Sequence, residues 1–357
     1  MNVNASHISK DGTILYGVPQ VEYGASGCTP FPMCVRACAN YLGQDVSYDY
    51  VMVASGAAFR LTWDTTSWNG GNVDTVFTFD DPLKVYKTGI ESLGRKFEFL
   101  DRASLSEPKK DNFIRFIKAQ IDKGYPCIAL GILGPPEACI ITGYKEGGQA
   151  LLGWSFFQDS PEFAGRIEID ESGYFISRNW WENPDTVAVM SMGEHVLPIA
   201  GPKEILQNAV QVLTGRKWQK YAKGVLAYDA WEKTLSDEAH FPGNAILPIL
   251  AERLMCHGDA MDCLADGRHN AALYIEKLAE ALPEHKDLCI QAKTHFSNIS
   301  SCIWKMAEIL GGYTRNEEQM RTLAKPEVRR RLCSLIRQCK AEDEKALEAI
   351  KTLYAGI

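Results

Sequence analysis

Histidine is scarce in this chain of 357 residues. The sequence has seven histidines, and only His7 and His195 lie outside the C-terminal part. His195 follows the apolar run 186–192 in Gly-Glu-His-Val-Leu-Pro, a pattern typical of a strand end, so we interpret it as exposed or locally paired. A site in the N-terminal half therefore has few histidines to use as a general base, unless the C-terminal part supplies one.

Long apolar runs and a basic surface are also missing. No run reaches about 18 apolar residues, and residues 1–7 lack the basic and apolar blocks of a signal peptide. We therefore expect a cytoplasmic protein without a membrane segment. The net charge of −7 argues against nucleic-acid binding, and the glycine pairs lack the Lys-Ser/Thr context of a phosphate-binding loop.

The eleven cysteines do not form the pattern of a disulfide framework or a zinc site. Their number is odd and they are scattered, which is typical of reduced core thiols. Cys256, His257, Cys263 and His269 lie close in sequence, but a compact Cys-x-x-Cys pair is missing among them. We therefore expect neither a metal nor a cofactor.

One cysteine stands in a context that activates thiols. Cys28 precedes the segment 33–42, whose alanines and cysteines before Gly43 predict a helix with a glycine stop. Pro30 and Pro32 fall where prolines cost a helix least. A thiol at a helix N-terminus has its thiolate favoured by the helix dipole and free N–H groups. This context predicts a nucleophile that attacks a carbonyl.

The arrangement resembles the papain-like cysteine enzymes, and most closely a bacterial branch whose cysteine is followed by an alanine-rich helix ending in Tyr-x-Gly. The resemblance implies that an upstream Gln and the backbone N–H of Cys28 hold the oxyanion. Gln20, eight residues before Cys28, matches by position. Glu22 stands nearer the spacing of papain, but a carboxylate cannot stabilise an oxyanion.

The same branch places its catalytic His at the start of a strand that runs His-x-x-x-x-x-Gly-Tyr. Here that position holds Glu137, at the head of Glu-Ala-Cys-Ile-Ile-Thr-Gly-Tyr. A carboxyl group near 4.3 is about four pK units below a thiol near 8.5, so proton transfer would be uphill by roughly 5.7 kcal/mol. The negative charge also disfavours the thiolate of Cys28. Ordinary peptide hydrolysis is therefore not expected without another base.

The pattern of elements predicts an α+β chain followed by a helical half. Gly-Pro at 201–202 marks a linker, so we expect domains at 1–198 and 199–357, with the second all-α and able to pair as a homodimer. The expected helices of the first part are 46–55, 82–93 and 111–123, and its strands are 126–133, 138–144, 150–154, 166–169, 173–177 and 186–192. The expected helices of the second part are 202–214, 219–235, 243–264, 267–282, 286–311, 325–340 and 342–354.

Two aromatic segments are candidates for ligand contact. The first contains Phe59, Arg60 and Trp63, and the second contains Trp154, Phe157 and Gln158. In a papain-like fold both would border the cleft, whereas the alternative is that these aromatic side chains fill an interface between the domains. Arg60 needs a partner inside its apolar run, which could be Glu137, an anionic substrate group or a structural ion pair.

Three motifs carry a resemblance to a more defined family. They are Cys-Val-Arg-Ala-Cys-Ala-Asn-Tyr-Leu-Gly at 34–43, Ser-Gly-Ala-Ala-Phe-Arg at 55–60 and Ile-Thr-Gly-Tyr at 141–144. Over about residues 14–195 the chain is similar to the N-terminal domains of the butirosin biosynthesis protein H-like family. The resemblance implies a papain-like fold and, for some members, transfer of an acyl group from a carrier thioester to an amine.

Two hypotheses of different classes follow. In the first, the cleft has lost catalysis and binds a small, cationic or amine-containing molecule, lined by Arg60, Trp63, Trp154 and Glu137. In the second, the chain is a cysteine acyltransferase or amide hydrolase in which Cys28 attacks and an unassigned base acts. A thioester substrate asks less of that base, because its leaving thiol needs little protonation.

Overall fold

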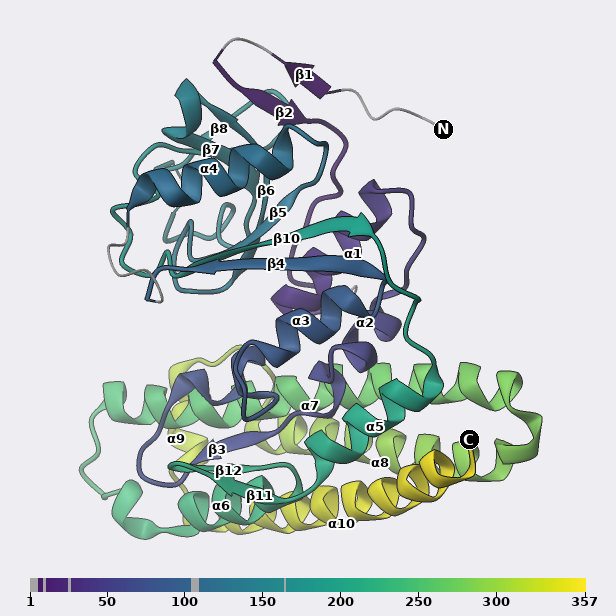
Figure 1. Ribbon diagram of the computed structural model, residues 1–357. Coiled ribbons are helices and arrows are strands. Elements are labelled where there is room, and N and C mark those ends of the chain that lie inside the picture. Colours follow the sequence, from purple (N-terminus) through teal and green to yellow (C-terminus); the bar gives the residue numbers. More distant parts are fainter. Residues whose placement is uncertain (1–5, 9–10, 25–26, 104–108, 164) are drawn as a thin grey trace. The chain divides into compact units, whose positions relative to one another are not determined.

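The computed structural model describes residues 6–8, 11–24, 27–103, 109–163 and 165–357. The chain forms two compact units, each built from two segments (Figure 1). The first unit comprises Met1–Val51 and Gly89–Ile199, and the second comprises Met52–Thr88 and Ala200–Ile357. None of the helices in the described part of the chain is long and apolar enough to span a membrane. The two units are taken separately below.

An antiparallel sheet forms the core of the first unit. Its strands follow one another in the order β4-β10-β5-β6-β7-β9-β8, and β2 pairs with both β1 and β6. The strands are β1 (Ser6–Ile8), β2 (Thr13–Leu15), β4 (Arg95–Asp101), β5 (Cys127–Leu130), β6 (Ala138–Lys145), β7 (Ala150–Trp154), β8 (Glu168–Ile169), β9 (Phe175–Ser177) and β10 (Ala188–His195). The expected α+β class is confirmed by this mixture of helices and antiparallel strands.

The central strands are buried along nearly their whole length. All four residues of β5 and the first seven of β6 are buried, which explains why they are continuous apolar runs rather than alternating ones. Helices α1 (Pro30–Tyr41) and α4 (Lys110–Ile121) pack against this sheet. β6 pairs with β5 through its first half and with β2 through its second, so it lies at the centre of the unit.

The expected helix ends in the first unit agree with the structure because glycines mark them. α1 ends just before Gly43, whose φ of +76° is a left-handed conformation that favours glycine. The other expected helices are α2 (Tyr48–Ala54), α3 (Lys84–Glu91) and α4. The chain passes from one unit to the other within α2 and within α3.

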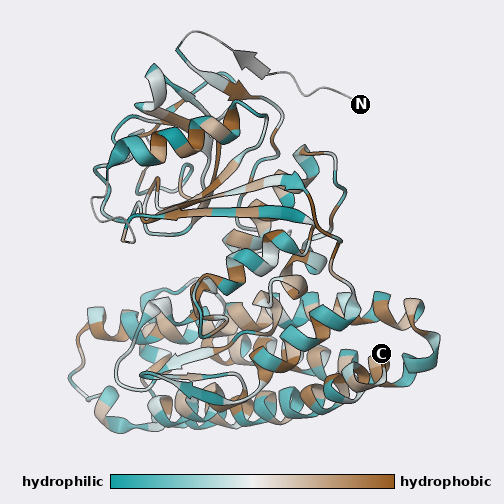
Figure 2. Ribbon diagram, viewed as in Figure 1, coloured by the Kyte–Doolittle hydropathy of each residue, from teal (hydrophilic) through white to brown (hydrophobic). Residues whose placement is uncertain are grey.

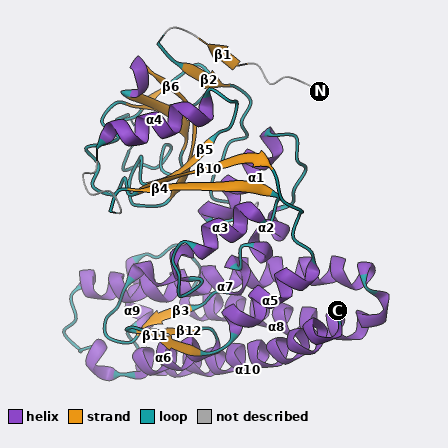
Figure 3. Cartoon of the chain, viewed as in Figure 1, coloured by secondary structure: helices purple, strands orange, loops and turns teal. Residues whose placement is uncertain are grey.

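The second unit is mostly helical (Figure 3). Its long helices alternate hydrophilic and hydrophobic residues, as amphipathic helices in a bundle do (Figure 2). They are α5 (Pro202–Leu213), α6 (Val225–Ser236), α7 (Leu247–Ala281), α8 (Lys286–Leu310), α9 (Glu317–Leu323) and α10 (Pro326–Gly356). Two expected breaks do not occur, since α7 and α10 are each a single helix.

The second unit is not all-α, and it does not begin at residue 199. Strands β11 (Arg216–Trp218) and β12 (Tyr221–Lys223) form a hairpin, and β12 takes the first residues of the helix expected over 219–235, which begins at Val225 as α6. β3 (Thr62–Asp64), which belongs to the N-terminal half of the sequence, pairs with β12. Residues 52–88 therefore belong to the second unit, whereas the expected division placed them in the domain 1–198.

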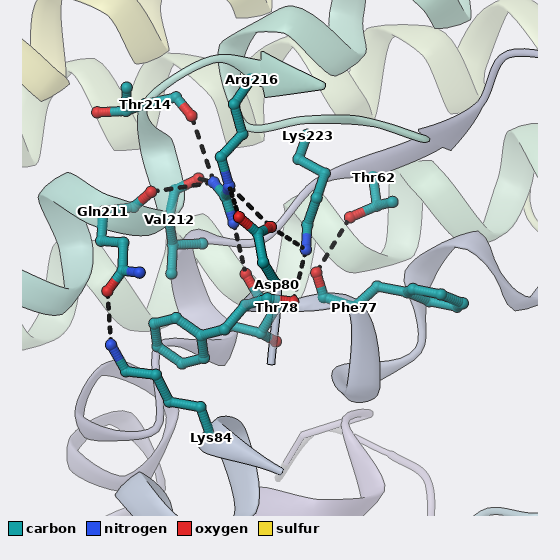
Figure 4. Close-up of polar contacts among 11 residues, drawn as sticks. Thr62, Phe77, Thr78, Asp80, Lys84, Gln211, Val212, Thr214, Arg216 and Lys223 are labelled. Atoms are coloured by element: carbon teal, nitrogen blue, oxygen red, sulfur yellow. Dashed lines mark hydrogen bonds and ion pairs between the residues drawn. The ribbon is translucent and has the colours of Figure 1, made fainter. Parts of the chain in front are cut away.

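A charged cluster reinforces this pairing (Figure 4). Arg216 donates to the carboxylate of Asp80 at 3.0 Å and to the carbonyl of Gln211 at the end of α5 at 3.0 Å. Lys223, of which only 1% is exposed, also donates to Asp80, at 3.1 Å. Lys84 donates to the side chain of Gln211 at 2.6 Å. The loop that carries Asp80 is therefore held to α5 and to the hairpin.

A buried ion pair lies at the centre of the second unit. The side chains of Arg268 in α7 and Asp343 in α10 are fully buried and 2.6 Å apart at their nearest atoms. Arg268 also donates to the carbonyl of Ala58 at 2.7 Å, and Tyr228 donates to Asp343 at 2.7 Å. Removing one partner of such a pair leaves a buried charge, which typically costs about 3–5 kcal/mol of stability. The segment 52–88 is thus part of this core.

Candidate functional site

Cys28 is the one cysteine that is not buried. It lies two residues before the start of α1 and is half-buried, whereas the other ten cysteines are buried. The helix begins with Pro30 at its first position, as the sequence predicts. The thiol of Cys28 is therefore the accessible one for chemistry or modification.

The backbone around Cys28 is held by Tyr48. Gly24 and Gly27 exchange two backbone hydrogen bonds of 3.1 and 3.2 Å. Gly27 has φ +136°, and a Cβ there would lie 2.5 Å from the ring of Tyr48. The Tyr48 hydroxyl in turn accepts a hydrogen bond from the backbone N–H of Thr29 at 3.1 Å. Only glycine fits this conformation and this close approach.

Glu137 lies directly before β6 and binds a tyrosine from the segment that leads to Cys28. The Tyr23 hydroxyl donates to the Glu137 carboxylate at 2.7 Å. Glu137 is half-buried, and its carbonyl accepts from the N–H of Gly131 at 3.1 Å. The residue at the expected histidine position is therefore an ordered carboxylate with a phenol bound to it.

Electrostatics show that the carboxylate acts on several groups around the start of α1. Tyr23 is 46% exposed, yet burial of its hydroxyl end, the Glu137 carboxylate and the thiols of Cys28 and Cys34 all raise the pKa of its phenol. Burial, the thiols of Cys38 and Cys139 and the Glu137 carboxylate raise the pKa of Cys34 well above its usual value. Tyr23 thus stays a hydrogen-bond donor to Glu137 at neutral pH.

Phe156 completes the group, and the sequence analysis did not name it. Its ring centroid lies 4.7 Å from that of Tyr23, with the two rings tilted by 40°. Phe156 is 9% exposed and lies two residues after Trp154 at the end of β7. Phe156 lies in the turn that follows β7, so no strand period singled it out in the sequence. Nothing in the sequence pointed to Tyr23.

Gln20 is exposed, in a segment that the sheet anchors. The indole N–H of Trp154 donates to the carbonyl of Val18 at 2.8 Å, and the N–H of Val18 donates to the hydroxyl of Tyr174 at 3.3 Å. Trp154 is buried and meets Tyr174 edge-to-face. Its structural role is to hold the chain before Gln20. The oxyanion role of Gln20 stays a prediction.

Phe157 and Gln158 have structural contacts within the loop after β7. Gln158 donates to the carbonyl of Gly173 at 3.2 Å and accepts from the N–H of Ser155 at 3.2 Å, so both ends of its amide are used. The Phe157 ring lies 6.2 Å from that of Phe163. These contacts give both side chains a role in shaping the loop on which Phe156 lies.

Phe59, Arg60 and Trp63 lie in the second unit and not beside Cys28 within the first. Phe59 and Trp63 are fully buried, and Trp63 stacks on Trp231 with centroids 5.8 Å apart. Arg60 donates to the carbonyls of Val73 and Ala57, each at 2.8 Å. Phe59 and Trp63 thus belong to the core of the second unit, and two backbone carbonyls of that unit are among the partners of Arg60.

His195 cannot replace the missing base within the first unit. Ala188 of β10 pairs with Leu130 of β5, and Leu130 pairs with Ala138, next to Glu137. His195 is seven residues farther along β10, a distance of about 20 Å at the usual rise of a strand. It therefore lies at the opposite end of the sheet from Glu137.

His257 of α7 has a structural role in the core of the second unit. His257 is buried, its Nδ1 accepts from the indole N–H of Trp231 at 3.1 Å, and burial lowers its pKa to about 3. Within the ranges that the structure describes, no three His, Cys, Asp or Glu side chains are grouped so as to hold a metal ion.

The arrangement at the start of α1 therefore combines an accessible thiol, a carboxylate and two aromatic rings. Comparison with known proteins adds no family to this description: no protein-family model matches the chain, and no curated protein matches its sequence. What the site can do follows from its chemistry. It can attract a cation through Glu137, and it can present a thiol to an electrophile.

Proposed function

We propose that the first unit is a papain-like domain whose Cys28 site has lost its general base and binds a small cationic or amine-containing ligand at Glu137. The observation that carries the proposal is the 2.7 Å hydrogen bond between Tyr23 and Glu137 at the position expected for the histidine. A carboxylate has about four lone-pair sites and can accept hydrogen bonds from several donors, and its charge-assisted bonds to ammonium groups are among the stronger ones.

The fold supports the papain-like part of the proposal. Cys28 precedes a helix that packs against the sheet, and β6, which starts next to Glu137, is one of the strands that this helix contacts. Strands β1 and β2 precede α1, and strands β5 to β10 all follow α4, the last α-helix described in the first unit. This order and this packing are what the resemblance to papain-like enzymes implies for a cysteine and a base that face each other.

The missing base supports binding over catalysis. A carboxylate is too weak a base for a thiol by about four pK units. His195 lies at the far end of the sheet, and Tyr23 is bound to Glu137. Within the first unit, the described residues thus offer no imidazole at the head of β6.

A cysteine-dependent acyltransferase or amide hydrolase is the alternative, and one observation favours it. Cys28 is the accessible thiol of the chain and lies at the N-terminal end of α1, where the helix dipole favours a thiolate. Gln20 would then contribute to the oxyanion hole. Thioester substrates are the ones with which this version should be tested first, because they need the least help from a base.

Binding of n-butylammonium, measured by saturation-transfer NMR with increasing ligand, tests the proposal. Glu137→Gln keeps an acceptor for Tyr23 but removes the charge, so we expect affinity to fall at least about tenfold. The matched control is Glu22→Gln, an exposed residue in the same segment as Tyr23, which should bind like the wild type. Equal binding by Glu137→Gln and the wild type would contradict the proposal.

A further inference from the structure

We infer that the cation of this site is an alkylated organic ammonium group, bound against the ring of Tyr23 next to the Glu137 carboxylate. The inference rests on the proposed function and adds the class of ligand. It comes from three groups of the first unit that contact one another: the Glu137 carboxylate, the half-exposed ring of Tyr23 and the ring of Phe156 that packs on it.

The Tyr23 ring is held in place from both ends. Its hydroxyl is fixed on Glu137 at 2.7 Å, and its ring packs on Phe156 with centroids 4.7 Å apart. The next residue, Gly24, is tied to Gly27 by two backbone hydrogen bonds. A side chain with 46% exposure would ordinarily move freely, but these contacts order it before any ligand arrives. Pre-organisation of this kind lowers the entropy cost of binding.

The face of an aromatic ring attracts cations because its quadrupole is negative there. A cation within about 6 Å of the ring centroid gains from this field, most when part of its water shell is lost. The Glu137 carboxylate adds a full negative charge at the hydroxyl end of the same ring. Small inorganic ions retain their water too strongly to use a ring, whereas methyl or alkyl groups on nitrogen can pack on it. The pair therefore selects ammonium groups that carry apolar substituents.

Two probes separate the ring from the carboxylate. The n-butylammonium ion can donate N–H groups to Glu137, whereas tetramethylammonium has no N–H donor and must depend on the ring and on the charge. n-Butanol, which has a similar alkyl chain without charge, measures how much apolar contact alone contributes. We expect both ammonium ions to bind and n-butanol to bind more weakly than either.

Variants of Tyr23 test the inference in the full-length protein by saturation-transfer NMR. Tyr23→Phe keeps the ring, so tetramethylammonium should bind within about twofold of the wild type. Tyr23→Leu removes the ring and should weaken tetramethylammonium about two- to fivefold. Tyr313→Leu is the matched control, because Tyr313 is a similarly exposed tyrosine in the second unit. This variant should bind tetramethylammonium like the wild type. Thermal unfolding of each variant checks that the fold is retained.

The outcomes distinguish the inference from the proposed function. If Tyr23→Leu binds tetramethylammonium like the wild type while Glu137→Gln loses n-butylammonium, the ring has no part and the inference is overturned, but the cation site stands. If Glu137→Gln binds n-butylammonium unchanged, the cation site itself fails. Weaker binding of tetramethylammonium by Tyr23→Leu, with Tyr23→Phe and Tyr313→Leu unchanged, supports the inference.

Discussion

Gly27 determines where the thiol of Cys28 lies. Its φ of +136° suits glycine alone, and a Cβ would lie 2.5 Å from the Tyr48 ring, which is itself held by the N–H of Thr29. The ring belongs to α2 and is buried, so it cannot move aside without cost. The backbone on both sides of the thiol is therefore set by one glycine and one tyrosine.

Gly27→Ala should destabilise the protein through backbone strain and this clash. Strain of this kind typically costs about 1–3 kcal/mol in the free energy of unfolding. Gly124→Ala is the control, because Gly124 also has positive φ, +86°, but open space at its Cβ. Urea unfolding should show a larger loss for Gly27→Ala than for Gly124→Ala. Equal losses would mean that the Tyr48 contact does not constrain the site.

The site residues differ in how far the sequence predicts them. Motif spacing in the sequence indicates Cys28, Gln20 and Glu137. In the structure, Cys28 and Glu137 both raise the pKa of the Tyr23 phenol. Tyr23 and Glu137 are 114 residues apart, and no local pattern carries their hydrogen bond. Phe156 likewise belongs to the site only because the ring of Tyr23, a residue distant in the sequence, packs on it. Contacts between segments that the fold brings together are the part that spacing cannot supply.

At the scale of elements, a glycine can end a helix or allow close packing of a helix, and the sequence does not separate these two roles. Gly43, Gly94 and Gly124 follow helices and have positive φ, as predicted for helix stops. A break between two helices was expected at residues 265–266, next to Gly267, but α7 continues through both positions and through Gly267. A Cβ at Gly267 would lie 2.6 Å from the carbonyl of Ala58, so this glycine allows close packing instead. Tertiary contact, not backbone conformation, explains it.

Most of the three-residue strands lay outside the expected strand ranges, and so did the seven-residue β4, whereas the short strands β8 and β9 fell within them. β2, β3, β11 and β12 have three residues each, fewer than the four or more that period-two alternation needs to be recognised. β2 pairs with β6 and β3 pairs with β12, which are distant in the sequence, whereas β11 and β12 form a local hairpin. The long helices and the buried strands β5, β6 and β7 were predictable because their patterns extend over enough residues.

Glu342 joins α8 to α10 and should make stability depend on pH. It accepts from Asn298 at 2.8 Å, contacts Nδ1 of His295 at 2.8 Å and accepts from Lys345 at 3.0 Å. Burial alone would raise the pKa of Glu342, but these hydrogen bonds outweigh it and hold the pKa at about 2, below its usual 4.5. The stabilisation is therefore present above about pH 4.5 and is lost as pH falls towards 2.

Glu342→Gln should accordingly be less stable than the wild type at neutral pH, by up to about 3 kcal/mol. The difference in unfolding free energy should narrow as pH falls from 4.5 towards 2, because the wild-type carboxylate is then protonated. Urea unfolding at neutral pH and at about pH 3 checks this. Glu348→Gln, at an exposed i,i+3 pair with Lys351, is the control and should show little change. A difference that stays constant with pH would contradict the assignment.

At the scale of the whole molecule, the division into units follows contacts rather than chain order. The segment 52–88 lies in the N-terminal half of the sequence but pairs β3 with β12, stacks Trp63 on Trp231 and supplies a carbonyl to Arg268. A linker motif at Gly-Pro correctly marks where α5 begins. It cannot show that an earlier segment completes the core that follows.

A chain of residues 200–357 alone should therefore fold poorly. It would lack one strand of its sheet and one backbone acceptor of the buried Arg268, the carbonyl of Ala58, and it would expose Trp231. Joining residues 52–88 to 200–357 through a flexible Gly/Ser linker should restore a cooperative urea transition followed by tryptophan fluorescence. If fragment 200–357 unfolds as cooperatively as the joined chain and at the same urea concentration, residues 52–88 are not needed for folding of the second unit.

The account of function depends on the effect of Glu137 on Cys28, and alkylation tests it most directly. Iodoacetamide labelling of Cys28 is followed across pH by peptide mass spectrometry, with the ten buried cysteines as background. We expect slow labelling with a midpoint no lower than about 8.5, the value of an ordinary thiol, and faster labelling in Glu137→Ala. Fast labelling with a midpoint well below about 8.5, unchanged in Glu137→Ala, would contradict the account and identify Cys28 as a catalytic thiolate.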